Sequence, residues 1–288
     1  MAATLNSREA YALQTYPRRC PTPGLLAATL AAFLIATGTP AFAQWTHVAS
    51  PKLPRKPDGT PNLSAPTPRT ADGKPDLSGI WWVPDSSVEG VDAPPKYSLN
   101  LAAGLNPDDL GMLPWARDLM RQRQADQRKD MPTSRCLPWP VPAMAAVPVP
   151  FRIIQTSDSI VILHEELNMF RQIFLDGRDL SENPNPTWLG YSKGRWQGDT
   201  LVVDTRGFND RSWLDGLGHP HTEALHVTER YRRLDFGHME LEFTIDDPKT
   251  YSKVWTNKMP VELTPPDTQL YEDVCHENEK DAIHLVGK

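Results

Sequence analysis

The sequence contains few cysteines, only 3 in 288 residues. Cys20 precedes an apolar N-terminal run, which leaves Cys136 and Cys275 in the remainder of the chain. No cysteine has a partner at the Cys-x-x-Cys spacing, which argues against a zinc or thiol-exchange site. Two cysteines in an oxidising compartment ordinarily pair. We therefore expect a Cys136–Cys275 disulfide, and closing its loop of roughly 140 residues would stabilise the fold by about 4–5 kcal/mol in the chain-entropy model.

Outside the N-terminal segment the chain has no apolar run long enough for a transmembrane helix. That segment carries Arg18-Arg19, an apolar or small run over residues 24–38, and Ala41-Phe42-Ala43. A basic region, a short apolar run and an A-x-A tripeptide make a secretory signal with cleavage after Ala43. A membrane anchor is disfavoured because no stop-transfer pattern follows. The arginine pair leaves the twin-arginine export route open beside the general one. We expect a periplasmic or secreted protein without stable membrane insertion after cleavage.

Basic residues are fewer than acidic ones, 30 against 36. The formal net charge is −6, and loss of the signal segment removes three arginines and one glutamate, which makes it −8. A mildly acidic protein is a poor nonspecific ligand for nucleic acid or for anionic membranes. We expect a small molecule, and no nucleic acid, as the partner. The oligomeric state stays open.

Proline is abundant, at 29 of 288 residues, about twice its usual share, and this argues against long helices. One helix is expected over residues 107–129, where Pro107, Asp108 and Asp109 stand in the first turn and basic residues follow toward Lys129. Residues 44–77 are expected to form an extended arm. The arm contains an imperfect repeat, residues 55–64 and 69–78, each copy with an Asp-Gly turn signal and a proline.

Short runs with β-branched or aromatic residues fill the rest of the chain and predict about eight or nine strands. Gly198-Asp199 predicts a tight hairpin between two of them. Strands do not alternate with helices, which disfavours a doubly wound α/β fold. We expect a mainly β protein, an up-and-down antiparallel barrel or strongly curved sheet, with residues 78–288 as its domain. The expected strands cover residues 79–83, 151–156, 159–165, 169–175, 188–197, 200–205, 225–234, 239–245 and 251–257.

Three motifs, the DLSGIW run at residues 76–81, GRWQGDTLVVDT at residues 194–205 and PHTE through HVTER at residues 220–230, resemble an uncharacterised family of exported bacterial proteins. The resemblance extends over nearly all of the chain after the signal and includes both cysteine regions. It implies export and a lipocalin-like β-barrel. It supplies no reaction and no assigned catalytic residues.

The richest polar segment is residues 204–230. His219-Pro220-His221 has a metal-like spacing, because residues two apart in an extended chain project to the same side. His226 could complete three imidazoles around a divalent transition metal, with Asp215 or Glu223 as carboxylate ligand or outer partner. Against this, His221 and His226 are an odd number apart and would face opposite ways on one strand.

The same segment permits metal-free acid–base chemistry. His221 or His226 could act as a general base beside Asp215 or Glu223, with Arg206 stabilising developing negative charge. The simpler alternative is a cross-strand polar network on a solvated face. A ligand could also be held by aromatic and polar residues of this region, namely Trp213, Asn209, Tyr191 and Arg230.

Residues 190–194 match the G-x-S-x-G pattern of a nucleophile elbow, but no helix follows Ser192, so we expect that serine inside a hairpin strand. Three functions remain open from sequence. The first is an exported barrel that binds a small, partly apolar or aromatic molecule in its mouth. The second is a hydrolase, lyase or isomerase that uses the 204–230 segment. The third is an assembly role through the proline-rich arm.

Overall fold

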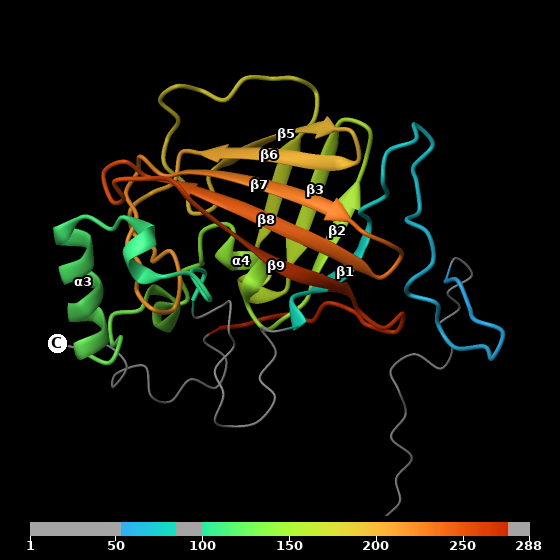
Figure 1. Ribbon diagram of the computed structural model, residues 1–288, viewed down its shortest axis with the longest axis horizontal. Coiled ribbons are helices and arrows are strands. Elements are labelled where there is room, and N and C mark those ends of the chain that lie inside the picture. Colours follow the sequence, from blue (N-terminus) through green and yellow to red (C-terminus); the bar gives the residue numbers. More distant parts are fainter. Residues whose placement is uncertain (1–52, 85–99, 276–288) are drawn as a thin grey trace, which may run out of the picture. The chain divides into compact units, whose positions relative to one another are not determined.

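Nine strands close into a β-barrel (Figure 1) in the order β1 to β9. The computed structural model describes residues 53–84 and 100–275, all within one compact unit, Ser50–Lys288. The mainly β barrel is therefore confirmed, while the predicted signal segment lies outside the described residues. The strands are β1 (Gly79–Trp82), β2 (Phe151–Gln155), β3 (Ser159–His164), β4 (Phe170–Phe174), β5 (Tyr191–Gln197), β6 (Thr200–Arg206), β7 (His226–Arg233), β8 (His238–Asp246) and β9 (Trp255–Leu263).

The barrel is mixed, which corrects the purely antiparallel expectation. Eight neighbouring pairs, including the closing pair β1–β9, are antiparallel, and β4 and β5 are parallel. After β4 the chain runs through residues 175–190, the yellow loop of Figure 1, before β5 begins. This long connection lets β5 run in the direction of β4, which a two-residue hairpin turn cannot do.

Strand positions follow the period-two burial of a sheet with one face on the core. On β8, Met239, Leu241, Phe243 and Ile245 are buried and their neighbours are not. The Gly198-Asp199 hairpin is confirmed, with Gln197 opposite Thr200 across the turn. Ser192 lies inside β5, as expected.

The last strand was predicted too early, over residues 251–257. Tyr251 instead precedes β9, is buried, and donates its hydroxyl to the carbonyl of Pro220 at 3.0 Å. Pro260 made the end of this strand hard to predict, because proline is rare inside strands. It is tolerated because β1 pairs with β9 only at Glu262 and Leu263, so the missing N–H of Pro260 interrupts no ladder with β1.

The sizeable helix is shorter than predicted. α3 (Pro114–Ala125) begins at Pro114, because Gly111 with φ 64° separates it from the 3-10 turn η2 (Pro107–Leu110). It ends where Gln127 and Arg128 take positive φ values. The other short helical segments are η3 (Pro132–Arg135), α4 (Ala143–Ala146) and η4 (Glu166–Asn168). None of the helices in the described residues is long and apolar enough to cross a lipid bilayer.

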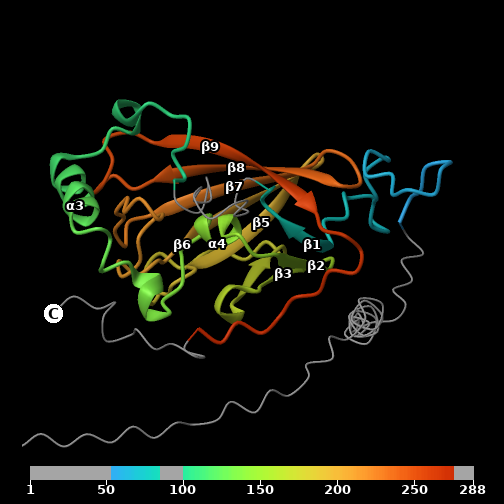
Figure 2. The same ribbon diagram turned by 90° about the horizontal axis from the view of Figure 1, so that it is seen from below.

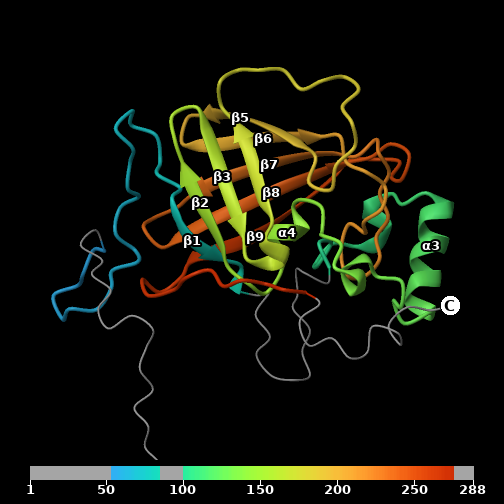
Figure 3. The ribbon, with the colours of Figure 1, turned by 180° about the vertical axis from the view of Figure 1, so that it is seen from behind.

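The core lies inside the barrel and includes α4. Figure 2 shows α4 within the ring of strands, Figure 3 shows it on the side of the barrel toward α3, and all four of its residues are buried. Trp81, Phe151 and Tyr231 are among the largest side chains that are fully buried. Apolar side chains from the strands and from α4 therefore fill much of the lumen.

The predicted disulfide is present. Cys136, at the end of η3, pairs with Cys275, with a Cα–Cα distance of 5.8 Å. The chain just before Cys275 is also bonded to the β3–β4 turn, where Asp273 accepts the backbone N–H of Leu167 at 2.6 Å. The disulfide thus fastens the end of the described chain to the barrel.

Candidate functional site

A cleft of about 570 Å³ lies beside one rim of the barrel, where β6 and β8 end and β7 begins. Three predicted site residues, Arg206, Glu223 and His226, line it. They come from the end of β6, the loop before β7 and the first position of β7. The wall opposite them belongs to the loop between β4 and β5. The complete lining is Glu182, Asn183, Pro184, Pro186, Arg206, Gly207, Phe208, Glu223, Ala224, Leu225, His226, Asp246 and Pro248.

The loop wall of the cleft is held by backbone bonds. Thr187 donates its N–H to the carbonyl of Gly207 at 2.9 Å, and Asn209 donates to the carbonyl of Thr187 at 2.8 Å. Gly207 has φ 79°, and a Cβ there would lie 2.6 Å from the Cγ of Pro184. Glycine at this position therefore permits both the turn and the close approach of the wall.

The cleft lining contains one histidine, His226. Its Nε2 lies 3.5 Å from Oδ1 of Asp204, a residue of β6 that sequence reasoning did not single out. Partial burial lowers the pKa of His226, and the nearby Arg206 guanidinium lowers it further, against the opposing effect of Asp204 and Asp246. The imidazole is consequently neutral at neutral pH and has a carboxylate beside it.

Acidic side chains outnumber basic ones in the cleft. Glu182, Glu223 and Asp246 face a single guanidinium, that of Arg206. Phe208 and Leu225 are buried beneath them, and Pro184, Pro186 and Pro248 add further apolar surface. The cleft combines an apolar floor with a negatively charged rim, which suits a small ligand that is neutral or cationic and partly apolar.

Asp215 and His219 lie outside the cleft and pair with each other. Asp215 Oδ2 is 2.7 Å from Nδ1 of His219 and also accepts the backbone N–H of Leu101 at 2.9 Å. Both side chains are buried. The pair holds a tight loop and the segment after residue 100 together, so Asp215 pairs with His219 and not with His221 or His226, the two predicted bases.

His221 is also buried and bonded locally. Its Nε2 lies 2.9 Å from the hydroxyl of Ser212, and its Nδ1 lies 3.3 Å from the carbonyl of Thr222. Burial is the main cause that lowers the pKa of His221. The ring packs edge-on against Phe208 at 6.3 Å, behind the cleft floor. It supports the floor without lining the cleft.

The predicted three-imidazole metal site is not formed. Within residues 53–84 and 100–275, no group of three or more His, Cys, Asp or Glu side chains could hold a metal ion. The physical reason is that His219 and His221 each take a local partner, Asp215 and Ser212, and only His226 reaches the cleft. The spacing of His219-Pro220-His221 was misleading because the loop does not run as an extended strand.

The four predicted ligand-binding residues are dispersed. Trp213 is buried under Arg123, whose guanidinium carbon lies 4.5 Å from a Trp213 ring centroid. Asn209 is buried and caps a turn by accepting the N–H of Arg211 at 3.0 Å. Arg230 is paired with Glu242 on the outer wall, 3.6 Å away. Tyr191 alone adjoins the cleft, because its ring packs beside Gly207.

A buried polar cluster inside the barrel was missed. Arg171 on β4 donates to both carboxylate oxygens of Glu229 on β7, and its Nε donates to Ser192 at 3.0 Å. Tyr231 donates to Glu229 at 2.8 Å, and Thr205 accepts from Arg171 at 2.9 Å. Each residue occupies an inward position of its strand. The sequence signal was the period-two alternation of β7, which places Glu229 on the same face as Val227 and Tyr231.

His164 lies inside the barrel near this cluster. Both of its ring nitrogens are buried and form no hydrogen bond of good geometry among the described residues, although the backbone of Met144 interacts with the ring, and Phe151 packs against it at 5.8 Å. Burial lowers the pKa of His164 to about 3, and the positive charge of Arg171 contributes in the same direction. The ring is therefore neutral over the whole physiological range.

Comparison of the chain with protein-family models, with curated proteins and with solved structures finds no match.

Proposed function

We propose that the protein binds a small, partly apolar molecule carrying a cationic group, in the cleft beside the barrel rim. The observation that carries this proposal is the convergence of Arg206, Glu223 and His226 with Glu182 and Asp246 around a volume of about 570 Å³. Pockets of this size commonly hold small ligands. The cleft replaces the barrel mouth as the proposed binding site, because α4 and apolar side chains occupy much of the lumen.

The charge of the lining defines the ligand class. An ammonium group gains from the carboxylates of Glu223 and Asp246, and an apolar body gains from the partly exposed rings of Pro184, Pro186 and Pro248. A carboxylate ligand would meet three like charges and one guanidinium, which costs binding free energy. Benzylamine and benzoate, which have the same ring and opposite charges, are therefore matched probes.

Isothermal titration of the protein with both probes tests this proposal. We expect benzylamine to bind more tightly than benzoate, and Glu223→Gln and Asp246→Asn to weaken benzylamine binding. The matched control is Glu240→Gln, which removes a carboxylate on the outer wall of β8 that pairs with Lys258. Equal binding of the two probes, or equal loss in the control, would contradict the proposal.

The Asp204–His226 pair favours a second candidate, an enzyme. A neutral His226 could accept a proton from a bound substrate, with Asp204 stabilising the imidazolium and Arg206 stabilising negative charge on the substrate. This would be a hydrolase, lyase or isomerase without a required cofactor. A panel of small esters of amino alcohols tests it: turnover should vanish in His226→Gln and persist in Arg230→Gln. Turnover that survives in His226→Gln would exclude this role.

We propose further that the protein works in the periplasm or outside the cell. The signal-like segment ending at Ala43 supports this, and the Cys136–Cys275 disulfide is consistent with it. The DLSGIW and GRWQGDT motifs support membership of the exported family that they resemble.

A further inference from the structure

The two copies of the short repeat in the arm form the same loop. Arg55 donates to the carbonyl of Gly59 at 2.7 Å, and Arg69, fourteen positions later, donates to the carbonyl of Gly73 at 2.8 Å. Each arginine also forms an isolated β-bridge with a proline, Arg55 with Pro61 and Arg69 with Pro75. Because the two copies share the same geometry, the contacts of the second copy indicate what the first copy can bind.

The second copy is docked on the barrel. Arg69 pairs in bidentate fashion with Asp199 in the β5–β6 turn, through N–O distances of 2.9 and 2.7 Å. Pro75 and Leu77 of this copy are buried, and Gln155 of β2 bonds to the backbone of both. One acidic turn and one apolar contact area thus hold the loop in place.

The first copy has the same arginine, turn and apolar residues, but among the described residues it has no corresponding acidic partner. Within the described part of the chain, no carboxylate pairs with Arg55. Pro61, which corresponds to the buried Pro75, is exposed, and Leu63, which corresponds to the buried Leu77, is only partly buried. The backbone of Leu63 is bonded to the β7–β8 turn, because its carbonyl accepts the N–H of Gly237 at 2.7 Å.

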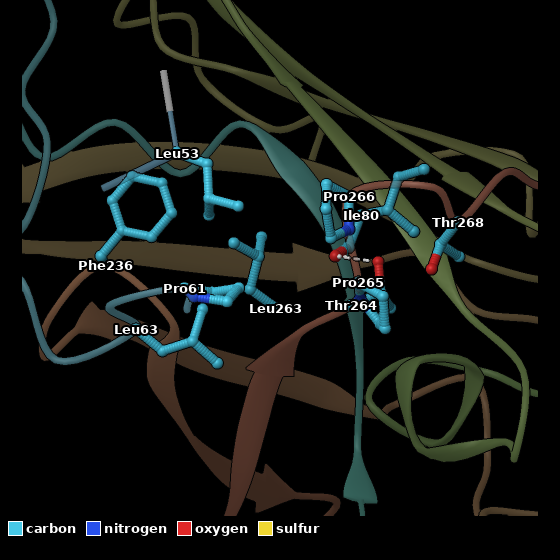
Figure 4. A pocket seen from close by; sticks show the side chains of 10 residues that line it. All are labelled: Leu53, Pro61, Leu63, Ile80, Phe236, Leu263, Thr264, Pro265, Pro266 and Thr268. Atoms are coloured by element: carbon cyan, nitrogen blue, oxygen red, sulfur yellow. Dashed lines mark hydrogen bonds between the residues drawn. The ribbon is translucent and has the colours of Figure 1, made fainter. Parts of the chain in front are cut away.

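An apolar pocket adjoins this unpaired arginine. Figure 4 shows Leu53, Pro61 and Leu63 of the arm facing Ile80, Phe236 and Leu263 of the barrel. The pocket has a volume of about 330 Å³. Its edge includes Pro61, the bridge partner of Arg55. The first copy therefore carries the exposed Arg55 and also contributes Pro61 and Leu63 to the lining of the apolar pocket.

We propose that the first repeat copy and this pocket form a docking surface for another protein that presents an acidic β-turn. The carboxylate of the turn pairs with Arg55, as Asp199 pairs with Arg69, and an adjacent apolar side chain enters the pocket. The planar fork of arginine suits a bidentate carboxylate. Arg55 and Lys56 also give this part of an acidic protein a local positive charge. A single β-turn bound to such a surface has a dissociation constant in the millimolar range, so a stable complex needs additional contacts.

The test uses a cyclised hairpin peptide that copies residues 194–201, the turn that the second copy binds. The full-length chain is expressed and labelled with ¹⁵N, and the Arg Nε–Hε signals are followed during the titration. We expect a saturable shift of the Arg55 signal. The affinity for the peptide should fall at least about fivefold when the peptide carries Asn in place of the aspartate. It should fall equally in Arg55→Gln, which lacks the Arg55 signal and is followed through the backbone amide signals of Gly59 and Leu63.

Arg69→Gln is the matched control, because it alters the same position of the other copy and should leave peptide binding unchanged. Absence of a saturable Arg55 shift, or equal shifts with the Asp and Asn peptides, would overturn the proposal. Sodium octanoate is titrated in parallel. If octanoate moves the Arg55 signal and the peptide does not, the surface takes a small amphiphile and the docking proposal is wrong.

Discussion

Arg171 and Glu229 form an ion pair inside the barrel, with side chains only 3% and 0% exposed. They belong to β4 and β7, which are not neighbours in the sheet, and Ser192, Thr205 and Tyr231 complete their hydrogen bonds. Removing one partner of a buried pair leaves an uncompensated charge, which is costly.

We expect Glu229→Leu to lower the free energy of unfolding by about 3–5 kcal/mol. The double variant Arg171→Met, Glu229→Leu should recover much of that loss, because it leaves no charge behind. Urea unfolding measures both. The exposed pair Arg230–Glu242 on the outer wall is the control, and Glu242→Gln should cost less than about 1 kcal/mol. A Glu229→Leu variant as stable as Glu242→Gln would contradict a stabilising role for the buried pair.

His164 should make the fold sensitive to acid. Its pKa of about 3 in the folded protein lies below the unfolded value, so the unfolded chain binds the proton first as pH falls. The contribution of His164 to the free energy of unfolding is fully present above pH ~6.5. It is lost as the pH falls toward ~3, at up to about 1.4 kcal/mol per pH unit. His164→Leu should flatten the dependence of unfolding free energy on pH over this range. Parallel curves for the two proteins would show that His164 is not the group responsible.

Reduction of the disulfide should destabilise the protein substantially. Cys136 and Cys275 are 139 positions apart, and the chain-entropy model gives a loss of about 5 kcal/mol for such a loop as an upper estimate. Urea unfolding with and without reductant, together with the double variant Cys136→Ala, Cys275→Ala, measures the loss. The double variant should match the reduced protein and should not respond to reductant. Identical transitions for oxidised and reduced protein would contradict this account.

Gly207→Ala should damage the cleft more than the barrel. The positive φ of Gly207 and the 2.6 Å approach of Pro184 require the wall loop to move if a Cβ is added. We expect a loss of about 1–2 kcal/mol in stability and weaker benzylamine binding. Gly198→Ala, with φ 60° and open space around its Cβ, is the control for backbone strain alone. Equal binding by the two variants would show that the wall does not contribute.

Local patterns explain why much of the barrel could be predicted. Alternation along β8 and the Gly198-Asp199 turn depend on neighbours in the chain, and these signals needed no distant partner. The disulfide could be predicted because only two cysteines follow residue 43, the predicted cleavage site. The last strand was predicted in the wrong place. Pro260, a residue type that is rare in strands, lies inside β9, and Tyr251 belongs to a buried turn before it.

The site was only partly predictable, since its residues meet through the closed sheet. Arg206, Glu223 and His226 were found because they share one polar segment. Asp204 begins the same segment but was not assigned a role, because its pairing with His226 arises only when β6 and β7 lie side by side. Glu182 comes from a loop about 40 residues earlier. Arg171 and Glu229 are 58 positions apart, and each of them taken alone would be expected on the surface. The alternation of β7 marks Glu229 as inward, but only the closed barrel brings Arg171 of β4 to it.

The location of ligand binding is tested most directly by NMR mapping with benzylamine on the full-length protein. We predict that saturable shifts concentrate on Phe208, Leu225 and His226, which line the cleft. Tyr231 and Ile160, which lie in the barrel core, should stay unchanged. Shifts concentrated on Tyr231 and Ile160, with His226 unaffected, would contradict the account and assign binding to the lumen.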